Sequence, residues 1–133
     1  MTRLRHTIRR HLYADPTAVE LLHAHLVTAW GLVLAMPWDT FSSNPAYAVL
    51  RDFASERLWA GALLLLGGAH LVSIMLDARW LRRVCSALVW GLWCIVSVGF
   101  WLTQAASRTT AIVTYPLLAL SSGWAYWRVW ICQ

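Results

Sequence analysis

The fold is decided by an apolar block at residues 58–76, which reads LWAGALLLLGGAHLVSIML. A helix of about 20 residues rises about 30 Å, which is the thickness of the hydrocarbon core of a bilayer. Three further apolar blocks of similar length lie at residues 17–36, 84–102 and about 110–129. The sequence therefore predicts an all-α integral membrane bundle of four transmembrane helices, formed by one domain that covers residues 1–133.

The composition disfavours several classes of protein. Hydrophobic residues make up 59% of the 133 residues and charged residues 13%, whereas soluble domains average about 45–50% and about 25%. So little charge cannot cover the surface of a soluble domain of this length. A soluble enzyme, a disordered chain and a nucleic-acid-binding domain are therefore disfavoured.

The basic residues indicate the orientation. The formal net charge is +5, and all eleven basic residues are arginines, most of which lie at the ends of the apolar blocks. This placement favours topology signals and lipid headgroup contacts over a nucleic-acid interface. With the N-terminus inside, the inner arginines are Arg3, Arg5, Arg9, Arg10, Arg79, Arg82, Arg83 and Arg128, and the outer ones are Arg51, Arg57 and Arg108. The excess of positive charge on the inner side predicts that both termini lie in the cytoplasm.

Two segments outside the blocks have amphipathic patterns. Residues 1–14 combine arginines with an apolar stripe of period four, which indicates either a basic helix on the membrane surface or a frayed tail. Between the first two blocks, Ala46, Val49, Leu50 and Phe53 follow helical spacing. We therefore expect a short interfacial helix over about residues 45–55.

Aromatic residues near the ends of the blocks are expected to anchor the bundle at the membrane surface. Together with two residues of the interfacial stripe, the predicted anchors are Trp38, Phe41, Tyr47, Leu50, Phe53, Trp59, Trp80, Trp101, Trp127 and Trp130. The tryptophans that lie deeper in the blocks are expected to fill the bundle; these are Trp30, Trp90, Trp93 and Trp124.

The candidate site is a set of ionisable residues within the predicted spans, namely Glu20, His23, His25 and His70. Such groups are expensive in hydrocarbon, so they need partners or a function. His23 and His70 lie at one depth, and Gly67 and Gly68 beside His70 would leave room for a flat cofactor. Three interpretations stay open: a hydrogen-bonded polar cluster, a b-type haem bound by His23 and His70, and a metal site or proton relay. The cluster without a cofactor is favoured, and no metal site is predicted.

Motifs of nucleophilic or phosphate-binding chemistry are absent from the sequence. It contains no GxSxG, no Walker loop and no GxGxxG. We therefore expect a protein that is not an enzyme and that has no catalytic residue.

Three stretches carry a resemblance to known proteins: WGLVLAMPWDTF at residues 30–41, SSNPAYAVL at 42–50 and ASERLWAGALLLLGGAHL at 54–71. In these stretches the chain resembles small four-span membrane proteins of unknown activity that are encoded in tailed-phage and prophage genomes. The resemblance implies a phage or prophage context, and through it a holin or superinfection-exclusion role. It implies no catalytic residue.

Three functions are consistent with these features. The first is a holin-like membrane effector that self-associates in the inner membrane. The second is a subunit of a larger membrane complex, which either carries a b-type haem or anchors other subunits. The third is a superinfection-exclusion or structural protein whose outer segment, residues 38–57, contacts another membrane protein. The expected partners are the lipid bilayer, further copies of the chain or another membrane protein, and not nucleic acid.

Overall fold

A computed structural model describes residues 15–43, 45–102 and 111–132, and the chain is helical throughout these ranges apart from short connections. This result confirms the predicted all-α fold class. The long helices of the described ranges are α2 (Thr17–Ala35), α5 (Glu56–Met75), α6 (Arg79–Leu102) and α7 (Ala111–Cys132). The short elements α3 (Thr40–Ser43), η1 (Pro45–Tyr47) and α4 (Ala48–Phe53) connect α2 to α5. The basic segment 1–14 lies outside the described residues.

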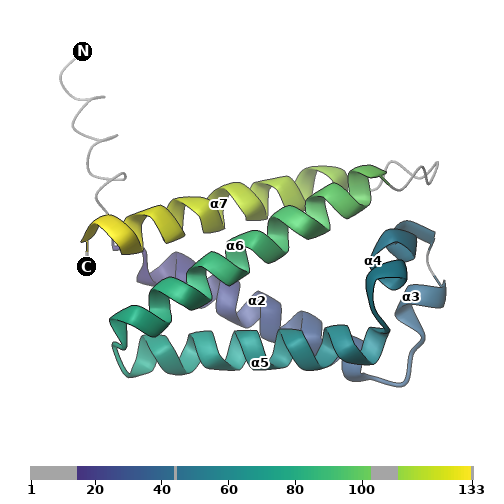
Figure 1. Cartoon of the computed structure of the whole chain (residues 1–133), viewed down its shortest axis with the longest axis horizontal. Helices are drawn as coiled ribbons and strands as arrows, with labels where there is room; N and C mark the ends of the chain where they lie inside the picture. The colour runs from purple at the N-terminus through teal and green to yellow at the C-terminus, as the bar shows by residue number, and fades with distance from the viewer. Residues whose placement is uncertain (1–14, 44, 103–110, 133) are drawn as a thin grey trace, which may run out of the picture.

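The long helices pack as two antiparallel pairs (Figure 1). Helix α2 packs along α5, α6 packs along α7, and contacts between α5 and α6 join the pairs into one bundle. The start of α2 and the end of α7 lie at one end of the bundle, whereas α3 and α4 lie at the other (Figure 1). Helices α2, α5 and α6 are each long and apolar enough to cross a membrane.

Helix α6 begins at Arg79, earlier than the predicted third span at residue 84. The reason is a tight turn at Asp77, whose φ of 47° lies in the left-handed region that aspartate tolerates better than most residues. The turn ends α5 through bonds from the amide of Asp77 to the carbonyl of Ile74 (3.2 Å) and from that of Ala78 to Ser73 (3.0 Å). The connection therefore needs few residues, and the basic stretch after it becomes the first turn of α6.

The start of α2 is held by Asp15. Its carboxylate accepts hydrogen bonds from Oγ1 of Thr17 (2.7 Å) and from the amide of Thr17 (3.0 Å). These bonds hold the pKa of the Asp15 carboxyl below its usual value. Since the folded pKa is the lower one, this cap stabilises the fold above the usual carboxyl pKa and is lost as the pH falls through the lowered value.

The connection between α2 and α5 differs from the predicted single helix over residues 45–55. It consists of α3, η1 and α4, and its predicted apolar stripe is split between two environments. Leu50 is 1% exposed and packs against Gly99 of α6, whereas Phe53 is 76% exposed. The side chain of Ala46 lies outside the described residues. The stripe therefore does not form one continuous surface, because α6 covers Leu50 while Phe53 stays exposed. An interfacial position of this segment stays a prediction.

Two polar contacts fix this connection to the start of α5. Both carboxylate oxygens of Glu56 accept backbone amide bonds, from Thr40 at 3.0 Å and from Phe41 at 3.2 Å, and so cap α3. The indole nitrogen of Trp59 donates to the carbonyl of Leu50 (3.0 Å). The connection is therefore a folded part of the bundle.

The predicted aromatic anchors fall into two groups. Phe41 is buried, and Tyr47 stacks on Phe41 and meets the edge of Phe100, so both belong to the core at this end of the bundle. Their interpretation as surface anchors is thus replaced by a packing role, and Leu50 and the half-buried Trp59 join them. The other anchors are exposed, as contact with lipid headgroups requires: Trp38, Phe53, Trp80, Trp101, Trp127 and Trp130.

Aromatic rings also fill the centre of the bundle. Trp93 is buried and stacks on Trp30 and Tyr115, with ring centroids 5.8 Å and 5.9 Å apart. Trp90 points outward instead, since it is 41% exposed and stacks on Tyr126. The expectation that the deep tryptophans fill the bundle is confirmed for Trp93 and wrong for Trp90.

The closest approach of α2 and α5 gives the first prediction. A Cβ atom at Gly67 would lie 2.2 Å from Oγ1 and 2.8 Å from the backbone nitrogen of Thr28, whereas a Cβ at Gly68 would meet nothing within 4 Å. Gly67→Ala should therefore push the helices apart and lower the free energy of unfolding by about 1–3 kcal/mol. Gly68→Ala is the matched control and should cause no loss. The two variants are compared by thermal unfolding in detergent, and equal stabilities would contradict the close packing.

Candidate functional site

The candidate site centres on Glu20, which lies in the first turn of α2 and is 1% exposed. The Arg82 guanidinium forms an ion pair with this carboxylate through Nη2, and its Nε lies 3.5 Å from Oε1. Arg82 belongs to the first turn of α6 and is itself 5% exposed. Removing one buried charge from such a pair would leave the other without compensation, so the pair holds the starts of α2 and α6 together.

Two further donors of Arg82 bond groups other than Glu20. Its Nη1 donates to Asp77 in the turn before α6 (3.2 Å), and its Nη2 donates to Oγ1 of Thr17 (3.1 Å). A guanidinium has five N–H donors in a fixed plane, so it can bridge several acceptors at once. Arg82 therefore connects α2, the α5–α6 turn and α6 in one network.

His70 brings α5 into the same network. Its Nε2 lies 3.6 Å from Oε1 of Glu20 and 3.4 Å from Oγ of Ser86, and the Ser86 hydroxyl donates to Oε1 of Glu20 (3.0 Å). Because the serine proton is committed to the carboxylate, Nε2 of His70 is the nitrogen that donates to Ser86. This assigns the other ring nitrogen, Nδ1, as an acceptor in the neutral ring.

His23 lies next to this network but binds α7. Its Nε2 lies 3.0 Å from Oγ of Ser121, whose hydroxyl donates to the carbonyl of Leu118 (3.1 Å). The same reasoning makes Nε2 of His23 the donor and Nδ1 the acceptor. The Nδ1 atoms of His23 and His70 are both buried without a partner among the described residues. Both rings line a cavity of about 10 Å³, which is at the lower limit for one water molecule.

The structure brings together three of the four predicted site residues, Glu20, His23 and His70. His25 is the exception, because it is exposed and its Nδ1 bonds the carbonyl of Leu21 (2.7 Å) in its own helix. Residues two apart on a helix face different directions, and this separates His25 from His23.

Sequence reasoning missed Arg82 and Ser86 as members of the site. Arg82 was interpreted only as a topology signal at the end of a span. The signal that could have identified it is its helical spacing, since Arg82 precedes the buried Cys85, Ser86 and Val89 by three, four and seven residues. An arginine in register with a buried stripe needs a buried acid, and Glu20 is the acid available.

The arrangement bears on the hypotheses of a bound cofactor. Thr28 fills the space beside Gly67, and the cavity between the histidines is far smaller than a haem, so a haem between them would need α2 and α5 to separate. Within the described ranges, no group of three His, Cys, Asp or Glu side chains could hold a metal ion. Haem binding stays a hypothesis, which the absorbance spectrum of the purified protein tests.

Comparison with known proteins gives no match to a family model, to a curated protein or to a solved structure.

The second prediction is a double-mutant cycle on the buried ion pair. Glu20→Gln and Arg82→Gln should each lower the free energy of unfolding by about 3–5 kcal/mol, because each leaves a buried charge without its partner. The double variant should lose clearly less than the sum of the single losses. His25→Gln is the control at an exposed position of α2, with an expected change within about 0.5 kcal/mol. Unfolding in mixed micelles measures all four, and additive losses would mean that the pair is not energetically coupled.

Proposed function

We propose that the chain is a four-span protein of the bacterial inner membrane, in which α7 forms the fourth span. The 22 residues of α7 rise about 33 Å, enough to cross the hydrocarbon core, and α7 packs antiparallel along α6. Serine, tyrosine and tryptophan residues lower its hydropathy relative to α2, α5 and α6. Contact with α6 covers part of this polar surface, and Ser121 and Ser122 bond carbonyls of their own helix.

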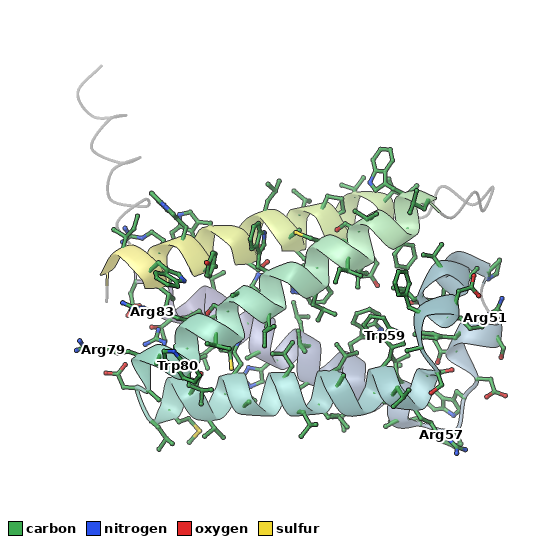
Figure 2. All side chains as sticks on the ribbon, in the orientation of Figure 1. Arg51, Arg57, Trp59, Arg79, Trp80 and Arg83 are labelled. Atoms are coloured by element: carbon green, nitrogen blue, oxygen red, sulfur yellow. The ribbon has the colours of Figure 1, made fainter. Side chains whose placement is uncertain are left out.

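The charges at the two ends of the bundle support this arrangement. Arg79 and Arg83 lie at the end where α2 starts and α7 finishes, and Arg51 and Arg57 lie at the opposite end (Figure 2). Long apolar helices between two charged ends match the layers of a bilayer. We propose that the first end faces the cytoplasm, since the basic segment 1–14 also belongs to it in sequence.

The third prediction concerns this topology. A reporter that is active only in the periplasm should be active when fused after residue 104 and inactive when fused after Gln133. A reporter that is active only in the cytoplasm should show the reverse pattern. Equal activity of one reporter at both positions would mean that α7 does not cross the membrane, and a fusion after Asp77 provides the cytoplasmic reference.

We further propose a holin-like, non-enzymatic function that depends on self-association in the membrane. The observation that supports it is an apolar groove of about 960 Å³ between α6 and α7, lined by Trp90, Val98, Trp101, Leu120 and Trp127 among others. These side chains are exposed in the single chain. In lipid, helices associate by close packing, so a groove that accepts a helix of a second copy favours assembly.

The fourth prediction tests this function in bacteria. Expression of the wild type should dissipate the membrane potential and stop growth above a threshold amount of protein. Val98→Trp fills the groove with a bulky side chain and should raise that threshold about tenfold, as expected when packing of about 1–3 kcal/mol is lost. Leu65→Trp places the same bulk on an exposed site of α5 and should leave the threshold unchanged. An intact potential at every expression level would rule out a holin-like function.

The folded connection between α2 and α5 favours one second candidate, a superinfection-exclusion or structural protein. Glu56 and Trp59 hold this connection in place while Trp38 and Phe53 stay exposed on it. An ordered outer surface with exposed aromatic rings is suited to contact with another membrane protein. A chain that leaves the potential intact but protects its host from a second phage would favour this candidate.

A further inference from the structure

The structure separates the arginines at the cytoplasmic end into two kinds, which the sequence alone does not distinguish. Arg82 is buried and bonded to Glu20, Asp77 and Thr17. Arg79 is exposed and Arg83 is half-buried, and they lie four residues apart on one face of the first turn of α6. Figure 2 shows both at the same end of the bundle, beside Trp80.

Arg79 and Arg83 have no ion-pair partner within the described part of the chain. The first turn of α6 contains no acidic residue. The two nearest acids, Glu20 and Asp77, both pair with Arg82, whose single charge balances one of them. Like charges four residues apart on a helix repel each other, so the pair of Arg79 and Arg83 is unfavourable unless an anion lies between them.

Arg83 is also incompletely bonded. Its guanidinium carbon lies 5.1 Å from the ring centroid of Trp130 on α7, and this contact holds the side chain against the bundle. Its Nε atom is nevertheless buried and has no hydrogen-bond partner among the described residues. The side chain is thus held in position with an unused donor.

The surface around the two arginines has the character of a membrane interface. Trp80 and Trp130 are exposed next to them, and Met75 and Leu76 at the end of α5 add exposed apolar surface. Arg51 and Arg57 at the opposite end also form no ion pair with a described residue, but neither has a buried donor without a hydrogen-bond partner. A guanidinium that is held against an aromatic ring and has a buried, unused donor therefore occurs in the pair Arg79 and Arg83 and not at Arg51 and Arg57.

We propose that Arg79 and Arg83 bind the phosphate of an anionic phospholipid, whose acyl chains lie along the exposed apolar side chains below. Arginine matches the planar, bidentate geometry of a phosphate, and the tryptophans occupy the headgroup level. A zwitterionic phospholipid carries its own positive group and cannot compensate the two arginines equally well. This proposal rests on the membrane arrangement proposed above.

The test uses the full chain in detergent micelles to which phosphatidylglycerol is added, and it reads the lipid concentration that gives half of the increase in thermal stability. The double variant Arg79→Gln, Arg83→Gln should need about 30-fold more lipid, because each arginine near an anionic surface contributes about fivefold in affinity. Arg51→Gln with Arg57→Gln is the matched control and should respond like the wild type. Arg79→Lys with Arg83→Lys retains the charge and should keep most of the response.

Three other results of this test would overturn the proposed lipid site. Equal stabilisation by phosphatidylcholine, or equal loss in the control at Arg51 and Arg57, would overturn the proposal, since the effect would then not depend on this pair. Equal stabilisation by inorganic phosphate would assign a free anion instead of a lipid and would also overturn it. Extraction of the chain from bacterial membranes by carbonate is measured in parallel. Extraction of the chain by carbonate would contradict the proposed membrane arrangement itself. Retention in the membrane without a preference for anionic lipid would contradict only the proposed lipid site.

Discussion

The ion pair between Glu20 and Arg82 is the interaction on which the rest of the bundle depends. Neither charge is stable alone in an apolar interior, so the two helices that carry them have to meet at one depth. This requirement fixes α2 against α6, and His70 and Ser86 extend it to α5. Asp77 adds the turn between α5 and α6 to the same network. This buried network thus sets the positions of three helices along the bundle axis. Apolar packing alone would allow the helices to slide past one another along that axis.

The two ends of the bundle are stabilised in different ways. The end with Glu20 is held by charges and hydroxyl groups inside the helices. Toward the other end, aromatic rings take over, from Trp93 and Trp30 through Tyr115 and Phe100 to Tyr47 and Phe41. The packing of these aromatic rings involves no charged groups. The connection between α2 and α5 therefore folds against them without further buried ions. The polar end determines how the helices are aligned along the bundle axis, and the aromatic rings fill the space between the helices toward the other end.

Much of the architecture could be predicted from sequence because it follows from local quantities. Block length and hydropathy identify the long helices. The expense of ionisable groups in hydrocarbon identifies Glu20, His23 and His70, but the same argument also selected His25, which is exposed. The predictions that the structure corrects concern which residue packs against which, and a local sequence pattern does not reveal these contacts. The stripe through Leu50 and Phe53 has the same period whether lipid or α6 covers it, and Gly67 indicates close approach without saying whether Thr28 or a cofactor approaches. Arg82 was missed because an arginine at the edge of a span resembles a topology signal.

The separation of Glu20 and Arg82 along the chain has a consequence for how the protein enters a membrane. The two residues are 62 positions apart, so α2 is synthesised, and leaves the ribosome, well before α6. During that interval the carboxylate of Glu20 has no basic partner inside the bilayer. Until α6 is present, helix α2 therefore carries an acid whose charge is expensive in hydrocarbon. Because the turn at Asp77 is so short, α5 and α6 form one hairpin, and Arg82 lies just after this turn, where it pairs with Glu20.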